Sequence, residues 1–82
     1  MAKTKEQQIN DAREADRLLR DETLQRVFAE VEQQVFDGIA SSELGDVEEV
    51  MRLQAELYGV TALRRRLRIW VDAGIIAEKS AK

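Results

Sequence analysis

Four of the chain's nine arginines, Arg64, Arg65, Arg66 and Arg68, lie in the segment LRRRLRIW near the C-terminal end. Guanidinium groups bind phosphates and carboxylates through paired hydrogen bonds. These arginines therefore indicate a nucleic acid, the acidic surface of another protein, or carboxylates of the same chain. On a helix, at about 100° per residue, Arg66 projects on the side opposite the other three, so the four do not converge as in a helix that reads a DNA groove.

Carboxylates inside the chain are the favoured partners of these arginines. Thirteen of the sixteen Asp and Glu residues lie between residues 6 and 49, ahead of the arginine segment. Long arginine stems can cover apolar edges while the guanidinium groups reach acids on a neighbouring antiparallel helix. The acids expected within reach are Asp21, Glu22, Glu30, Glu32 and Asp37.

Catalysis has few groups available. The chain has no His and no Cys, and therefore neither an imidazole base nor a thiolate nucleophile, and it has no Gly-rich phosphate loop. Glu30 and Glu32, like Glu48 and Glu49, do not share a helix face, and Glu49 and Glu56 are two turns apart, too far for one metal ion. We therefore expect no catalytic residue, no metal ligand and no cofactor.

The elements that position these residues are all expected to be helices. The chain has no proline, only four glycines and 35% charged residues, a composition typical of an all-α protein. Residues 1–8 are polar and aperiodic, so we expect them to be disordered. Residues 9–77 should form one helical domain, and residues 78–82 a flexible tail.

The apolar pattern predicts an N-terminal helical arm over about residues 10–20, followed by an antiparallel hairpin. Asp21 can cap a new helix, although the same residues could lie inside one continuous helix; we favour a bend. The next helix carries a single apolar stripe and should end near Gly38. After the loop ASSELG, Asp46 and Glu49 resemble a capping box for a long helix expected from Val47 to Ala73, with Gly74 as its C-terminal stop.

The long helix has two apolar stripes, which is typical of a helix packed on two sides. The first stripe forms a heptad-like seam for the hairpin: Val50, Leu53, Leu57, Val60, Leu63, Leu67, Trp70 and Val71. The second lies on roughly the opposite side: Met51, Ala55, Tyr58, Ala62, Ile69 and Ala73. It must be covered by the N-terminal arm, by another copy or by a different protein. We favour another copy or a partner, and hence an oligomeric bundle.

Bulk properties restrict the possible partners. The net charge of −3 argues against general attraction to nucleic acids or anionic membranes. No apolar run approaches the roughly 20 residues that a membrane-spanning helix needs. The first 17 residues lack the apolar core of a secretory signal. We therefore expect a soluble protein without a small-molecule substrate.

The order of these features resembles a loose group of small helical proteins encoded by tailed phages and prophages near head and packaging genes. The resemblance covers about residues 14–77, including EADRLLRDETLQRVF and LRRRLRIWVDAGIIAE. It implies a virion-assembly or other accessory role through protein–protein contact, in the host cytoplasm or in the virion.

The expected function is therefore a non-enzymatic protein–protein interaction module, in particular a phage structural or assembly protein that acts as a helical homo-oligomer. Two alternatives stay open. One is a small nucleic-acid-binding regulator that uses the Arg64–Arg68 segment. The other is an acidic phage inhibitor of a host nucleic-acid-binding protein.

Overall fold

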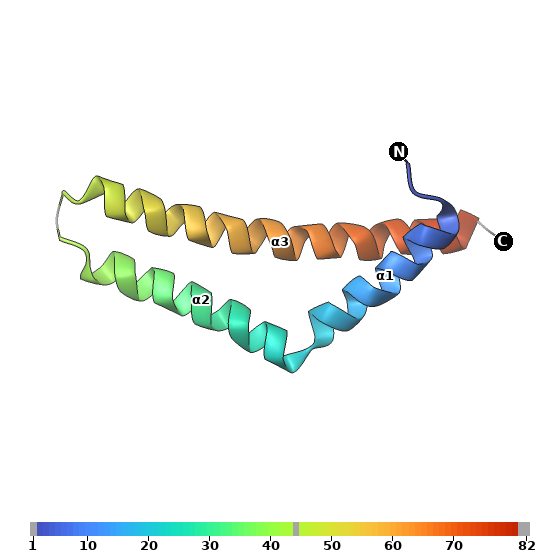
Figure 1. Cartoon of the computed structure of the whole chain (residues 1–82), viewed down its shortest axis with the longest axis horizontal. Helices are drawn as coiled ribbons and strands as arrows, with labels where there is room; N and C mark the ends of the chain where they lie inside the picture. Colours follow the sequence, from blue (N-terminus) through green and yellow to red (C-terminus); the bar gives the residue numbers. More distant parts are fainter. Residues whose placement is uncertain (1, 44, 81–82) are drawn as a thin grey trace.

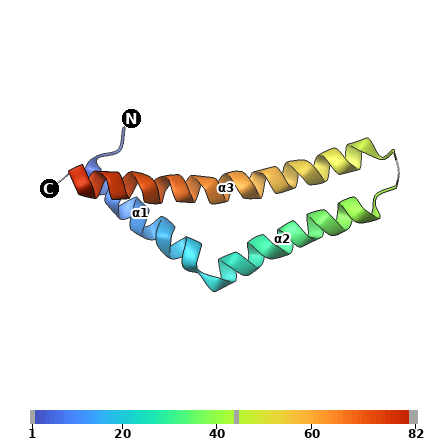
Figure 2. The same ribbon diagram turned by 180° about the vertical axis from the view of Figure 1, so that it is seen from behind.

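The computed structural model describes residues 2–43 and 45–80, and within them it contains three helices and no strand. They are α1 (Lys5–Arg20), α2 (Glu22–Ser41) and α3 (Val47–Ser80). The all-α prediction is confirmed. In Figure 1, α2 and α3 form the antiparallel hairpin, and α1, on the other side of the bend, slants from the bend to the C-terminal half of α3. The view from behind in Figure 2 shows the same three-sided outline, which measures 58 × 28 × 16 Å.

Helix α1 begins at Lys5, earlier than expected, because Thr4 caps it. The Thr4 hydroxyl accepts a hydrogen bond from the Gln7 N–H at 3.1 Å, and the Thr4 N–H donates to the Gln7 side-chain oxygen at 3.0 Å. This capping box satisfies two donors at the helix start. Residues 5–8 are therefore helical, although the sequence predicts disorder for them.

The bend between α1 and α2 consists of one extended residue, Asp21 (φ −69°, ψ 120°). Its carboxylate accepts a hydrogen bond from the Leu24 N–H at 2.8 Å, as predicted for an N-cap. The side chain of Gln25 donates to the backbone oxygen of Leu19 at 2.8 Å, which satisfies a carbonyl in the last turn of α1.

The bend also aligns two apolar stripes that a continuous helix would separate. Leu19 and Phe28 are nine residues apart, which corresponds to roughly two and a half helical turns at about 100° per residue. In an unbroken helix they would point to opposite sides. Because Asp21 is extended, both α1 and α2 turn their apolar side chains toward α3.

Helix α1 packs closely on α3 because small residues face each other. Ala15, Gly74 and Ala77 are buried there, and a Cβ built on Gly74 would lie 2.1 Å from the Cβ of Ala12. Gly74 therefore serves close helix contact and does not stop α3. The predicted end of this helix at Ala73 is wrong, and residues 78–80, predicted as flexible tail, belong to the helix.

Helix α2 packs on the N-terminal half of α3 through larger side chains. Phe28, Val35 and Leu53 are buried. A Cβ on Gly38 would lie 2.8 Å from Cδ1 of Leu53, so this glycine also serves packing, and α2 continues past it to Ser41. Asp46 caps α3 by accepting from the Glu49 N–H at 3.2 Å.

Candidate interaction surface and the arginine segment

The second apolar stripe of α3 forms a largely uncovered face, here called the outer face: Met51, Ala55, Tyr58, Ala62, Ile69 and Ala73. Met51 is 62% exposed, Tyr58 70% and Ile69 42%. Ala55 and Ala62 are exposed as well, whereas Ala73 is half-buried. Leu53, buried by the hairpin, projects about 160° away from Met51 around the helix. Helices α1 and α2 therefore cover most of the first stripe, in which Leu63 and Trp70 stay exposed, and leave most of the outer face open.

The N-terminal segment borders the C-terminal part of the outer face. The Lys3 ammonium lies 3.7 Å from the centroid of the Trp70 ring and 2.7 Å from a carboxylate oxygen of Asp11. A small hollow of about 170 Å³ separates this segment from α3 and is lined in part by Arg66, Ile69 and Ala73. The freely open part of the outer face is thus the stretch from Met51 to Ala62.

Two further exposed apolar residues extend the outer face at both ends. Val47 precedes Met51 by one turn, and Ile76 follows Ile69 by two turns. Neither was included in the predicted interface. The same helical spacing could have identified both, but the expected helix ended at Ala73 and so excluded Ile76.

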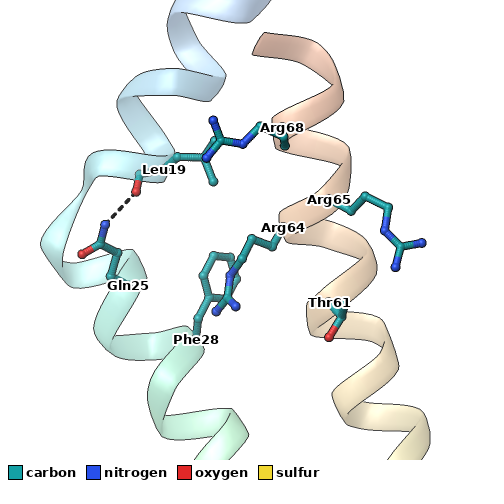
Figure 3. A pocket seen from close by; sticks show the side chains of 7 residues that line it. All are labelled: Leu19, Gln25, Phe28, Thr61, Arg64, Arg65 and Arg68. Carbon is teal, nitrogen blue, oxygen red and sulfur yellow. Dashed lines mark hydrogen bonds between the residues drawn. The ribbon is translucent and has the colours of Figure 1, made fainter. Parts of the chain in front are cut away.

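Arg64 occupies a position in the covered seam, between Val60 and Leu67. Its guanidinium carbon lies 4.9 Å from the centroid of the Phe28 ring (Figure 3). Its Nη2 donates to a carboxylate oxygen of Glu32. The predicted pairing with an acid on the antiparallel helix is thus confirmed for Arg64. Leu63, predicted for the seam, is exposed instead.

Three of the four arginines, Arg64, Arg65 and Arg68, line a cleft at the bend and diverge around it, whereas Arg66 lies at the hollow beside the N-terminal segment. This cleft has a volume of about 570 Å³ and lies between α3 and the α1–α2 junction. Arg64 covers Phe28 and Arg68 extends toward Leu19, whereas Arg65 extends from the rim of the cleft away from both (Figure 3). The bend carries α1 and α2 away from α3, and long arginine side chains reach into the widened space where a leucine would be too short.

The other predicted acidic partners do not pair with α3. Within residues 2–43 and 45–80, Glu32 is the only one of the five expected acids in an ion pair with an arginine of α3. Asp21 caps α2, and Asp37 accepts a hydrogen bond from Gln33 at 2.8 Å. Over the same residues, Arg65, Arg66 and Arg68 form no ion pair. The prediction of general pairing is therefore wrong for these three arginines.

The most perturbed titratable groups lie on an exposed helix surface. Hydrogen bonds from Arg52, reinforced by its charge, lower the pKa of Glu49, and the same contacts raise the pKa of Arg52. Arg52 lies 2.6 Å from Glu49 and 2.7 Å from Glu56. Such spacing is common for helix-stabilising ion pairs. In the described part of the chain, no group of three or more Asp or Glu residues is arranged to hold a metal ion.

Comparisons of the chain with protein-family models, curated proteins and solved structures return no match. No helix in the described residues is both long enough and apolar enough to cross a membrane. The outer face of α3 and the arginine cleft are therefore the two surface features that bear on function.

Proposed function

We propose that this chain is a non-enzymatic protein–protein interaction module whose contact surface is the outer face of α3. The exposure of Met51 and Tyr58 on a helix whose opposite side is already packed is the observation that carries the proposal. Contiguous exposed apolar side chains of this kind mark interaction sites. Tyr58 has an apolar ring with a polar tip, which suits a residue that becomes buried in an interface.

The small core supports the same proposal. The buried hydrophobic residues of the described chain are Ala15, Phe28, Val35, Leu53 and Ala77, and two of these five are alanines. A chain of 82 residues is marginally stable, because a small domain buries a smaller fraction of its surface on folding than a larger domain does. Burial of the outer face against another protein would add stability that this core lacks.

The biological setting that we propose is phage particle assembly. The resemblance of residues 14–77 to small helical phage proteins suggests this setting, and an elongated helical module with one open face suits such a role. The protein would act as a helical oligomer or dock on a larger assembly, in the host cytoplasm or in the virion. The placement of the arginines gives no specific support to the nucleic-acid-binding alternative, because Arg64 is engaged by Glu32 and Arg65 and Arg68 extend in different directions.

The test combines Tyr58→Glu and Ile69→Glu in one variant. The solution mass is measured by light scattering over a wide concentration range at two salt concentrations, and immobilised protein is used to capture partners from a cell extract. We expect the double variant to lose self-association or capture while circular dichroism shows unchanged helicity. Phe36→Glu is the control, because Phe36 is an exposed apolar residue on α2.

The proposal fails if the double variant associates as the wild type does in both measurements. It also fails if Phe36→Glu reduces association as strongly as the double variant, because a general response to added charge would then explain the loss.

A further inference from the structure

The open part of the outer face has a regular alternation of large and small side chains. Met51, Ala55, Tyr58 and Ala62 follow one another at steps of four, three and four residues. One helical turn before this stretch stands Glu48, and one turn after it stands Arg65. A face that begins with a negative charge and ends with a positive charge is complementary to its own reversed copy.

Resting on the proposed function, we propose that a second copy of this chain occupies this part of the outer face, with the two α3 helices antiparallel. In the pairing that we infer, Met51 packs beside Ala62 of the second copy, and Ala55 packs beside Tyr58. The same alignment places Glu48 beside Arg65 of the second copy. Because the arrangement is twofold symmetric, each contact occurs twice.

The size of the side chains favours this alignment. Each large residue meets an alanine, so the helices can approach closely without a clash. The overlap from Glu48 to Arg65 covers about 27 Å of helix at roughly 1.5 Å per residue. A Cβ on Gly59, near the centre of the overlap, would meet no other atom of the chain within 4 Å, so nothing in the described fold obstructs this side of α3.

The charges select this alignment over its competitors. Neither Glu48 nor Arg65 forms an ion pair within residues 2–43 and 45–80, so both are available to a partner. A parallel, in-register pair would place Arg65 beside Arg65 and Glu48 beside Glu48, and like charges at such positions destabilise the pair. An antiparallel pair shifted by one heptad would place Glu48 beside Asp72 and Arg65 beside Ala55.

A second copy can reach the outer face most easily along the N-terminal half of α3. The Lys3 side chain lies over Trp70, and the adjoining hollow borders Ile69 and Ala73. The second copy therefore has unobstructed access to Met51–Ala62, whereas the N-terminal segment borders the remainder of the face.

Reversal of the two charges provides the test. Glu48→Arg and Arg65→Glu are made separately, and the dimer dissociation constant is measured by analytical ultracentrifugation at low salt. Each single variant replaces two attractive contacts with two repulsive ones, and we expect the dissociation constant to rise about tenfold or more. In an equimolar mixture of the two variants, the positive charge introduced at position 48 of one chain meets the negative charge introduced at position 65 of the other. The mixture should therefore dimerise about as tightly as the wild type.

Glu30→Arg is the matched control. Glu30 lies on an exposed part of α2 about 140° from the middle of its packed stripe, and the substitution changes the charge by the same amount. It should leave the dissociation constant unchanged. Glu48 also interacts favourably with the helix dipole in the first turn of α3, so Glu48→Arg could weaken the dimer by destabilising that turn. Rescue in the mixture excludes this explanation, because the substituted turn is still present there.

A wild-type protein that stays monomeric at all concentrations overturns this inference, and the outer face would then belong to a foreign partner, as the proposed function still allows. A second outcome is that the Tyr58→Glu, Ile69→Glu variant loses the dimer while the charge reversals leave the dissociation constant unchanged. The outer face would then still be the interface, but the antiparallel pairing would be wrong. Single variants that weaken the dimer without rescue in the mixture also overturn it.

Discussion

Gly74 of α3 lies so close to Ala12 of α1 that a Cβ at position 74 would come within 2.1 Å of the Ala12 Cβ. The backbone oxygen of Gln8 would lie 3.1 Å from the same Cβ. The nearest neighbours of this Cβ are therefore a short side chain and a main chain, and neither can move aside as the end of a flexible side chain could. Docking of the N-terminal arm depends on this glycine.

Gly74→Ala should therefore separate α1 from α3. Overpacking of a tight contact costs roughly 1–3 kcal/mol, which exceeds the gain of about 1 kcal/mol from replacing glycine in a helix. Urea denaturation should show lower stability, and limited proteolysis should cleave α1 earlier. Gly59→Ala is the control on the same helix: its Cβ meets no atom within 4 Å, so stability should rise by up to about 1 kcal/mol. Equal effects of the two substitutions would contradict the close contact.

Asp21→Ala should destabilise the bend. The substitution removes the oxygen that accepts from the Leu24 N–H and makes a continuous α1–α2 helix easier to form. Loss of an N-cap costs about 1 kcal/mol. Asp21→Asn keeps an accepting oxygen and should cost much less in the same urea titration. If both variants are as stable as the wild type, the cap does not hold the bend.

Arg64→Ala should lower stability by about 1 kcal/mol, because it removes the guanidinium from the Phe28 ring and from Glu32. The Glu32 contact is partly exposed, so solvent screens it and it contributes the smaller share. Arg66→Ala is the control, because Arg66 forms no ion pair in the described residues. Its midpoint of thermal unfolding should differ little from that of the wild type. A similar loss in both variants would mean that the position of Arg64 in the seam is unimportant.

The Glu49 carboxyl should titrate at a lower pH than an ordinary glutamate, since hydrogen bonds from Arg52 stabilise its charged form and lower its pKa. Because the folded-state pKa is lowered, the stabilisation is present above the ordinary glutamate value of about 4.3 and is lost as the pH falls through the folded-state value. Carboxyl NMR titration of the wild type and of Arg52→Gln tests this. The pKa of Glu49 should rise in the variant, and an unchanged midpoint would rule out Arg52 as the cause.

The helical class, the Asp21 cap and the start of α3 at Val47 were predictable because each depends on local chemistry. The end of α3 was not predictable. Considered with its sequence neighbours alone, Gly74 is typical of a residue that ends a helix, whereas its observed role is to contact Ala12, which is distant in sequence. The same limit applies to Arg64. Its spacing places it in the seam with Val60 and Leu67, but only the separation of α2 from α3 near the bend explains why an arginine is suited there.

The outer face was predictable from periodicity, since α3 has more apolar positions than one neighbouring layer can cover. Its uneven exposure was not predictable from the sequence. The contact between Lys3 and Trp70 depends on where the first residues of the chain lie, and no repeat or motif in that segment indicates this position.

The three-sided outline of the molecule has a consequence for how its length can change. The closed outline is maintained by the bend at Asp21, the loop between α2 and α3, and the contact at Gly74. An insertion of one helical turn in α2 alone, about 5.4 Å, would move the α1 contact along α3 and away from Gly74. Viable variants of this protein should therefore gain or lose residues in α3 together with α1 or α2, in matched whole turns, and single-helix insertions should be found rarely outside the loop.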